Sequence, residues 1–173
     1  MIIGADSTDR DEGNPFWDFS LALYGSPGVA EACLGLQDDA GLDVNLVLYA
    51  CYLANQGLAL NPAQAAAVDQ CCSDWRDTVV QPVRALRREL KETAGHVSEL
   101  LLAAELAGER QQQNMIWQWH VAQALAPDQT NNTDALLRTN LACVATLANG
   151  SAATVYSFAL LVAGMLPITL AQC

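Results

Sequence analysis

Helix boundaries are marked along most of this 173-residue chain, and these marks constrain the fold more than any other feature. Asn14-Pro15, Ser26-Pro27 and Asn61-Pro62 each place a capping side chain before a proline at the first helical position. Proline costs nothing there, because its missing N–H needs no partner and its φ is already helical. Glycines, which favour helix C-termini, follow the apolar runs at Gly25, Gly41, Gly57 and Gly150.

These marks predict a series of helices and no strands. We expect helices near 15–24, 27–39, 43–56, 62–80, 134–148 and 152–166, with 82–125 forming one long helix or two helices separated at Gly95. No segment shows the period-two alternation of a half-buried strand. The sequence therefore predicts an all-α, single-domain helical bundle of about seven to eight helices over residues 14–173. Residues 1–13 are predicted to form a disordered acidic N-terminus.

One segment is predicted to lie at the centre of this bundle. Residues 43–57, DVNLVLYACYLANQG, are apolar on nearly every side of the helix they would form. A helix without a polar face is buried by its neighbours on all sides. We therefore expect the helix near 43–56 to be the central one.

Composition and charge limit the function classes. Apolar residues make up 52% and charged residues 16% of the chain, which excludes disorder for most of it. The net charge of −11 argues against a nucleic-acid partner and favours basic protein partners. The first residues contain no apolar h-region, so the sequence predicts a cytoplasmic protein. Six cysteines without a C-x-x-C pair, and only two histidines, predict buried thiols and no metal or other cofactor, with a redox or soft-metal site at the vicinal pair Cys71-Cys72 as the alternative.

The end of the chain leaves two alternatives open. No charged side chain follows Arg138, and residues 152–171 are twenty in number, the minimum needed to span a bilayer. Against a span stand Pro167 and the lack of flanking Lys or Arg. The segment is predicted either as a core helix, which we favour, or as a membrane contact. If it were exposed in solution, it would be an association surface and make a homo-oligomer possible.

Five of the eight cations lie within sixteen residues: Arg76, Arg84, Arg87, Arg88 and Lys91. On a helix over 83–101 they flank an apolar stripe formed by Val83, Leu86, Leu90, Ala94, Val97 and Leu101. Arg87 falls about 40° from the centre of that stripe, so it needs a partner, and the candidates are Glu105 and Asp43. Three interpretations stay open: an internal arginine–carboxylate network, an anion site for phosphate or carboxylate groups, and a solvated face.

Catalytic patterns are incomplete. The chain contains no P-loop, G-x-G-x-x-G or G-x-S-x-G motif. Asp39 and Asp43 have the D-x-x-x-D spacing of enzymes that bind isoprenoid diphosphates, but Gly41 lies between them as a predicted helix end. Asp43 is then the predicted N-cap of the next helix.

Several motifs resemble those of an uncharacterised bacterial family of conserved hypothetical proteins of about this length, a domain of unknown function. They are N-P-F-W-x-F-S-L-x-L-Y from Asn14, L-D-V-N-L from Leu42, W-R-D-x-V-V-Q-P-V-R-A-L-R-R-x-L-K from Trp75 and E-L-A-G-E-R-Q-Q from Glu105. The resemblance covers about Asn14 to Gln113 and implies a small soluble cytoplasmic protein without a defined activity. The family pattern includes Trp17, Phe19, Tyr24, Pro27, Gly28, Asp43, Asn45, Trp75, Arg76, Pro82, Arg84, Arg87, Arg88, Glu105 and Arg110.

The leading hypothesis is a non-enzymatic protein-interaction or regulatory module with a protein partner. The alternative is an enzyme or sensor that holds a phosphate-bearing ligand, such as an isoprenoid diphosphate, through Arg84, Arg87, Arg88 and Lys91.

Overall fold

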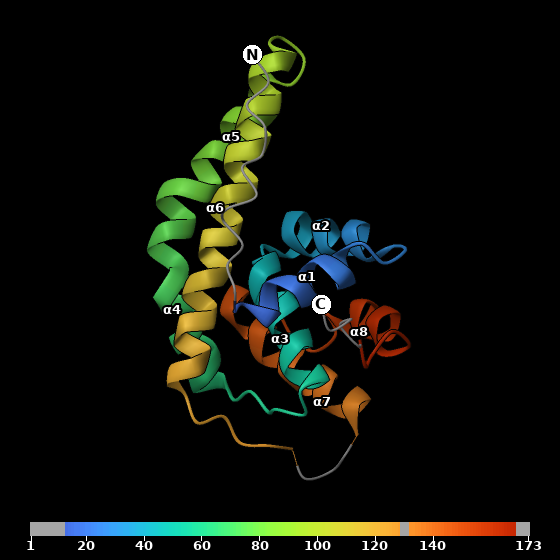
Figure 1. Ribbon diagram of the computed structural model, residues 1–173. Coiled ribbons are helices and arrows are strands. Elements are labelled where there is room, and N and C mark those ends of the chain that lie inside the picture. Colours follow the sequence, from blue (N-terminus) through green and yellow to red (C-terminus); the bar gives the residue numbers. More distant parts are fainter. Residues whose placement is uncertain (1–12, 129–131, 169–173) are drawn as a thin grey trace.

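The computed structural model describes residues 13–128 and 132–168, and within these ranges the chain is helical with no β-strand (Figure 1). Its α-helices are α1 (Pro15–Tyr24), α2 (Val29–Ala40), α3 (Val44–Asn55), α4 (Pro62–Trp75), α5 (Gln81–Leu90), α6 (Gly95–Ala122), α7 (Thr133–Ala145) and α8 (Tyr156–Ala163). A π-helical segment, η1 (Arg76–Val80), joins α4 to α5, and a 3-10 turn, η2 (Thr146–Ala148), ends α7. The predicted all-α bundle is confirmed. The predicted disordered N-terminus lies almost wholly outside the described residues.

Helix α3 is the centre of the bundle, as its apolar sequence predicts. Every residue from Asn45 to Ala54 is buried. The rings of Phe16 and Phe19 on α1 meet Tyr49 and Tyr52 of α3 edge-on, with centroids 5.4 and 5.5 Å apart. Edge-to-face packing suits the quadrupoles of aromatic rings and adds to the gain from burying them. The α1–α3 contact therefore anchors the N-terminal half of the core.

Two long helical segments form an antiparallel hairpin beside this core. One runs through α4, η1 and α5, and α6 returns along it; Figure 1 shows the α5–α6 end projecting well beyond the rest of the molecule. We call this projecting part, residues 81–107, the arm. Near its base the Trp75 indole donates to the Gly108 carbonyl oxygen at 2.9 Å. A Cβ added at Gly108 would lie 3.4 Å from Val80 Cγ2, in van der Waals contact, so the two segments approach closely there.

The predicted helix end before Pro82 is wrong, because the chain continues as a π-helix instead. Proline has no N–H and its ring clashes with the carbonyl four residues back. The π-helical turn shifts the register, and the Gln81 N–H donates to the Arg76 carbonyl oxygen, five residues back. One extra residue per turn thus carries the helix past Pro82.

The predicted continuous stripe over 83–101 is also wrong. The chain turns at residues 91–94, so α5 and α6 are separate helices, the second of the two arrangements that the sequence allows. No residue of α5 is buried, and Leu86 and Val97 of the predicted stripe are exposed. Because the arm leaves the bundle, its apolar residues have less neighbouring surface to cover them.

The capping predictions have mixed outcomes. The Asn14 and Asn61 side chains accept from backbone N–H groups of α1 and α4, and Asn61 forms a full capping box with Gln64. Ser26 does not cap α2: its hydroxyl donates to the Ala22 carbonyl oxygen at 3.1 Å, at the end of α1. Gly28, with φ +79°, occupies the N-cap position of α2 instead.

The uncharged tail is less helical than predicted. The last helix covers Tyr156–Ala163 rather than 152–166, because residues 152–155 form turns. Phe158, Ala159 and Val162 of α8 are buried, in agreement with the favoured core-helix prediction. None of the helices in the described ranges has the length and hydropathy to cross a bilayer. Residues 169–171 of the candidate span lie outside the described residues.

Candidate functional site

The arginines of the arm face carboxylates on α6 and α2. Arg84 Nε donates to Glu105 Oε1 at 2.7 Å, and its Nη2 donates to Glu109 Oε1. The third guanidinium nitrogen, Nη1, donates to Gln37 Oε1 on α2 at 2.8 Å. Arg84 therefore joins three helices through one side chain.

Glu105 lies between two arginines. It is 5% exposed, and its second oxygen, Oε2, accepts from Arg87 Nε. Arg88 forms a more exposed pair, Nη2 to Asp38 Oδ1, at 3.2 Å. Lys91 is exposed beyond the end of α5 and has no ion pair within the described ranges. Of the two predicted partners for Arg87, the structure uses Glu105.

The other predicted partner, Asp43, pairs with Arg76 at the base of the arm. Arg76 Nη1 lies 3.0 Å from Asp43 Oδ2 and 2.6 Å from Asp69 Oδ1, while its Nε lies 3.2 Å from Asp77 Oδ1. Asp43 Oδ1 accepts from the Asn45 N–H at 2.8 Å and caps α3, as its position after Gly41 predicts. Five of the seven predicted site residues thus fall into two groups, Arg84 and Arg87 around Glu105 and Arg76 beside Asp43, while Arg88 pairs with Asp38 and Lys91 lies apart.

Ion pairing and burial pull the carboxyl pKa values in opposite directions. Burial raises the pKa of Glu105, but hydrogen bonds from Arg87 and Arg84 outweigh it, so the pKa lies below its usual range. Burial also raises the pKa of Glu109, and there the attraction of Arg84 does not compensate. Because Glu105 has two guanidinium partners and Glu109 has one, Glu105 is the carboxylate that holds its charge more firmly.

A chain of side-chain amides extends from Asp43 into the molecule. Gln112 Nε2 donates to Asp43 Oδ2 at 2.5 Å, and Asn45 Nδ2 donates to Gln112 Oε1 at 3.1 Å. Gln113 Nε2 then donates to Asn45 Oδ1 at 2.8 Å. We call these three hydrogen bonds the amide relay. It connects the N-terminus of α3 to the middle of α6.

Two clefts share Arg84, Gln37 and Glu109 among their lining residues. The first, of about 470 Å³, is polar and is lined mainly by charged and amide side chains, among them Asp38, Asp43, Asp69, Arg76, Asp77, Arg88 and Gln112. The second, of about 300 Å³, lies between α1–α2 and the arm. We call the second cleft the groove. Volumes of this order are those of small-ligand sites.

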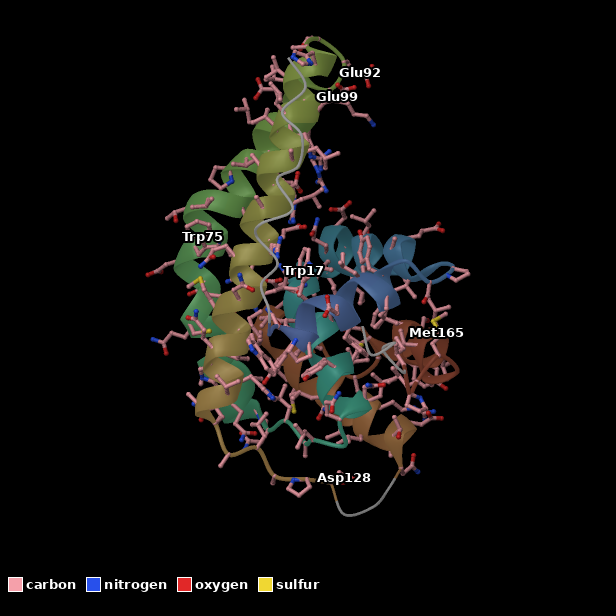
Figure 2. The ribbon with its side chains drawn as sticks, in the orientation of Figure 1. Trp17, Trp75, Glu92, Glu99, Asp128 and Met165 are labelled. Atoms are coloured by element: carbon pink, nitrogen blue, oxygen red, sulfur yellow. The ribbon has the colours of Figure 1, made fainter. Side chains whose placement is uncertain are left out.

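The groove is largely apolar. Its walls are formed by Trp17, Leu21, Tyr24, Leu34, Leu48, Leu102 and Leu106, with Ser20 and Gln113 also lining it. Figure 2 shows Trp17 between α1 and the middle of α6. The Arg110 guanidinium carbon lies 5.6 Å from the centre of the Trp17 ring, a cation–π distance that fixes the tryptophan against α6. The groove is therefore a shaped apolar surface with one wall on the arm.

His120 and Cys72 both have side-chain partners in the described part of the chain. No three His, Cys, Asp or Glu side chains there lie close enough to hold a metal ion. His120 Nδ1 lies 3.0 Å from the Tyr49 hydroxyl, and the ring stacks on Trp117, so this histidine is half-buried and has a partner. Cys72 is buried, and Gln112 Nε2 lies 3.6 Å from its sulfur.

Sequence reasoning missed the uncharged members of the site. Gln37, Gln112 and Gln113 connect the charged groups, and Leu102 and Leu106 form a groove wall, but none of them was predicted. Asn45 carried a usable signal, because it is a polar residue in a helix that is otherwise apolar all round. Such a residue needs a buried partner, and the neighbouring amides of Gln112 and Gln113 provide it.

The charged residues of the site and the residues that line the groove all lie within residues 15–116, and only the polar cleft also has lining residues from beyond this range, Val144, Leu147 and Ala148. A family model for a protein of unknown function, DUF2390, matches this same range, more than half of the chain. No curated protein and no solved structure matches the chain significantly. By the match over α1 to α6, the chain belongs to the DUF2390 family of proteins of unknown function.

Proposed function

We propose that the protein is a non-enzymatic interaction module whose groove receives an apolar segment of a partner protein. The observation that carries the proposal is the exposure of four leucines that line the groove: Leu21, Leu34, Leu102 and Leu106 are 43–55% exposed. They come from three helices and meet at one cleft. Apolar side chains gathered in this way are typical of interaction sites, whereas scattered exposed leucines are common and mean little.

The arm supplies the second support. Leu86, Val97 and Leu100 are also exposed along it, so the arm carries further apolar side chains outside the groove. The ion pairs of Arg84 and Arg87 with Glu105 hold α5 on α6 and keep this surface in one shape. A preformed site loses less conformational entropy when it binds. A helix or extended segment of a partner fits such a surface better than a compact substrate does.

Charge indicates what flanks the apolar part of the partner. The chain carries a net charge of −11, and the exposed residues Asp18, Asp38 and Asp39 lie on α1 and α2 beside the groove. Attraction of opposite charges speeds association and selects partners. We therefore expect basic residues on either side of the partner's apolar segment. The five described cysteines are free thiols, which fits an encounter in the reducing cytoplasm.

The rival anion site has less support. Arg84, Arg87 and Arg88 each face a carboxylate, and an anionic ligand would have to displace those partners. Glu105 and Glu109 would repel a phosphate group at the same place.

The test is photo-crosslinking in cells that naturally produce the protein. Leu106→p-benzoylphenylalanine places the crosslinker in the groove, and Leu160→p-benzoylphenylalanine, on the exposed side of α8, is the control. We expect one protein to be captured from position 106 and not from position 160, and Leu102→Glu to abolish its capture. Equal products at both positions, or none at position 106, would contradict the proposal. A crosslink to a second copy of the chain would replace the partner with a homo-oligomer.

A further inference from the structure

Two polar atoms beneath the groove have no hydrogen-bond partner. They are Ser20 Oγ on α1 and Gln113 Oε1 on α6, and both residues line the groove. Each residue is only 3% exposed. Buried polar groups are nearly always paired, and leaving one unpaired destabilises the fold, so two beside one cleft require an explanation.

The amide relay determines which atom of Gln113 is left over. The Asp43 carboxylate, paired with Arg76, only accepts, so Gln112 must present its NH₂ to it. Gln112 then accepts from Asn45, and Asn45 accepts from Gln113. Every amide in the relay is oriented by the one before it. Gln113 Oε1 is therefore an acceptor by necessity, whereas the Ser20 hydroxyl can donate or accept.

The charges at the groove favour a neutral ligand group. Arg84, Arg87 and Arg88 stand beside Glu105 and Glu109, and all five are engaged in ion pairs. The guanidinium groups would repel a cationic ligand group, and the carboxylates would repel an anionic one. The rings of Trp17 and Tyr24 and the surrounding leucines suit an aromatic body, since aromatic pairs are favourable beyond the area they bury.

We infer that the groove takes a neutral aromatic side chain bearing a hydroxyl, a tyrosine of the partner. This inference rests on the proposed function and names the residue that anchors the partner. A phenol both donates and accepts, so it satisfies Gln113 Oε1 and Ser20 Oγ at once, while its ring packs on the apolar walls. Both oxygens are closed to water, so the entering ring displaces a lining side chain to reach them.

Small molecules that copy side chains test the inference directly. The probes are p-cresol, the tyrosine side chain itself, and toluene, which has the same ring without the hydroxyl. Chemical shifts of the purified protein report where each probe binds. We expect both to shift groove resonances and p-cresol to bind about tenfold more tightly, the value of one to two net hydrogen bonds.

Ser20→Ala provides the matched variant. It removes an unpartnered hydroxyl, so the protein should remain folded with an unchanged or raised melting temperature while the preference for p-cresol falls to about threefold or less. Ser73→Ala is the control, because the Ser73 hydroxyl donates to the Gln70 carbonyl oxygen on α4, outside the groove. Its preference for p-cresol should equal that of the wild type.

The two proposals fail separately. Equal binding of toluene and p-cresol, or an unchanged preference in Ser20→Ala, overturns the tyrosine anchor and leaves crosslinking at position 106 to decide the docking function. A p-cresol preference that depends on Ser20, without any protein crosslink at position 106, overturns the docking function and keeps the hydroxyl site.

Discussion

Glu105→Gln tests whether ion pairs hold the arm together. No residue of α5 is buried, so apolar burial contributes little to fixing this helix on α6. Glu105 instead binds Arg84 and Arg87, whose side chains are 12% and 23% exposed. Glutamine keeps the size of the side chain and removes its charge. Two partly buried guanidinium groups then lose their shared anion.

The expected cost follows from that geometry. Removing one partner of a buried ion pair costs about 3–5 kcal/mol. Arg84 keeps Glu109 and Gln37, and Arg87 is partly open to water, so we expect about 2–3 kcal/mol here. The substitution should lower the free energy of local opening of the arm and leave that of the central helix α3 unchanged, because α3 is buried mainly by helices other than α5.

Hydrogen exchange measured by mass spectrometry separates the two parts of the molecule. Amide protection in α5 should fall by about 30- to 150-fold, the factor that 2–3 kcal/mol gives, while α3 keeps its protection. Glu99→Gln, at the arm tip labelled in Figure 2 and 82% exposed, is the control and should change neither. A loss below threefold in α5, or an equal loss in α3, would refute the reasoning.

The same variant predicts a pH dependence. The folded pKa of Glu105 lies below its value of 4.5 in an unfolded chain, because its arginine hydrogen bonds outweigh burial. Its stabilising contribution is therefore complete above about pH 4.5 and is lost as the pH falls toward the folded pKa. Glu109 affects stability in the opposite direction. Burial raises its pKa in the folded state, so its charged form destabilises the fold, and this destabilisation disappears when Glu109 is protonated as the pH falls. Wild-type α5 should lose protection below about pH 4.5, and Glu105→Gln should not.

Three further predictions concern residues outside the arm. Burial lowers the pKa of His120, so the unfolded chain binds the proton first; the melting temperature should fall as the pH drops below about 6.5, and His120→Gln should remove this slope. Asn140→Leu should cost about 3 kcal/mol or more in urea unfolding, because Asn140 accepts from the Leu60 N–H and donates to two backbone carbonyls. Asp43→Asn keeps a capping side chain and loses the charge facing Arg76, so it should cost about 1–2 kcal/mol, and Asp43→Ala about 1 kcal/mol more in the same assay.

The fold was predictable where a signal is local. Asn14 and Asn61 cap the helices that follow them, and Gly41 ends α2 with φ +66°. These outcomes depend only on residues within one turn. The π-helix before Pro82 was not predictable in this way, because the continuation past proline depends on packing between α4–α5 and α6. Ser26 carries the same local signal as Asn14, but Gly28 takes a left-handed conformation and starts α2 two residues later.

The site was predictable as far as charge alone determines it. Arg87 was predicted to lie close to the core and therefore to need an anion. Glu105, a charged residue in an apolar run, was the nearer along the chain of its two predicted partners. Gln37 could not be predicted, because it reaches Arg84 from another helix. Asp69 lies seven residues before Arg76 on the same continuous helical segment, a spacing that the sequence analysis did not use. The groove was hidden for a related reason. Its lining side chains come from helices that are far apart along the chain, and no local pattern places those helices beside one another.

Asp43 joins these separate features into one arrangement. The carboxylate that caps α3 also pairs with Arg76 at the base of the arm and orients Gln112. Because amides transmit that orientation one by one, the charge at the start of α3 determines that Gln113 turns an acceptor toward the groove. Asp43→Asn removes this constraint, since an asparagine amide accepts or donates and the relay can then reverse. The preference of the groove for p-cresol should therefore fall in Asp43→Asn even though Asp43 does not line it.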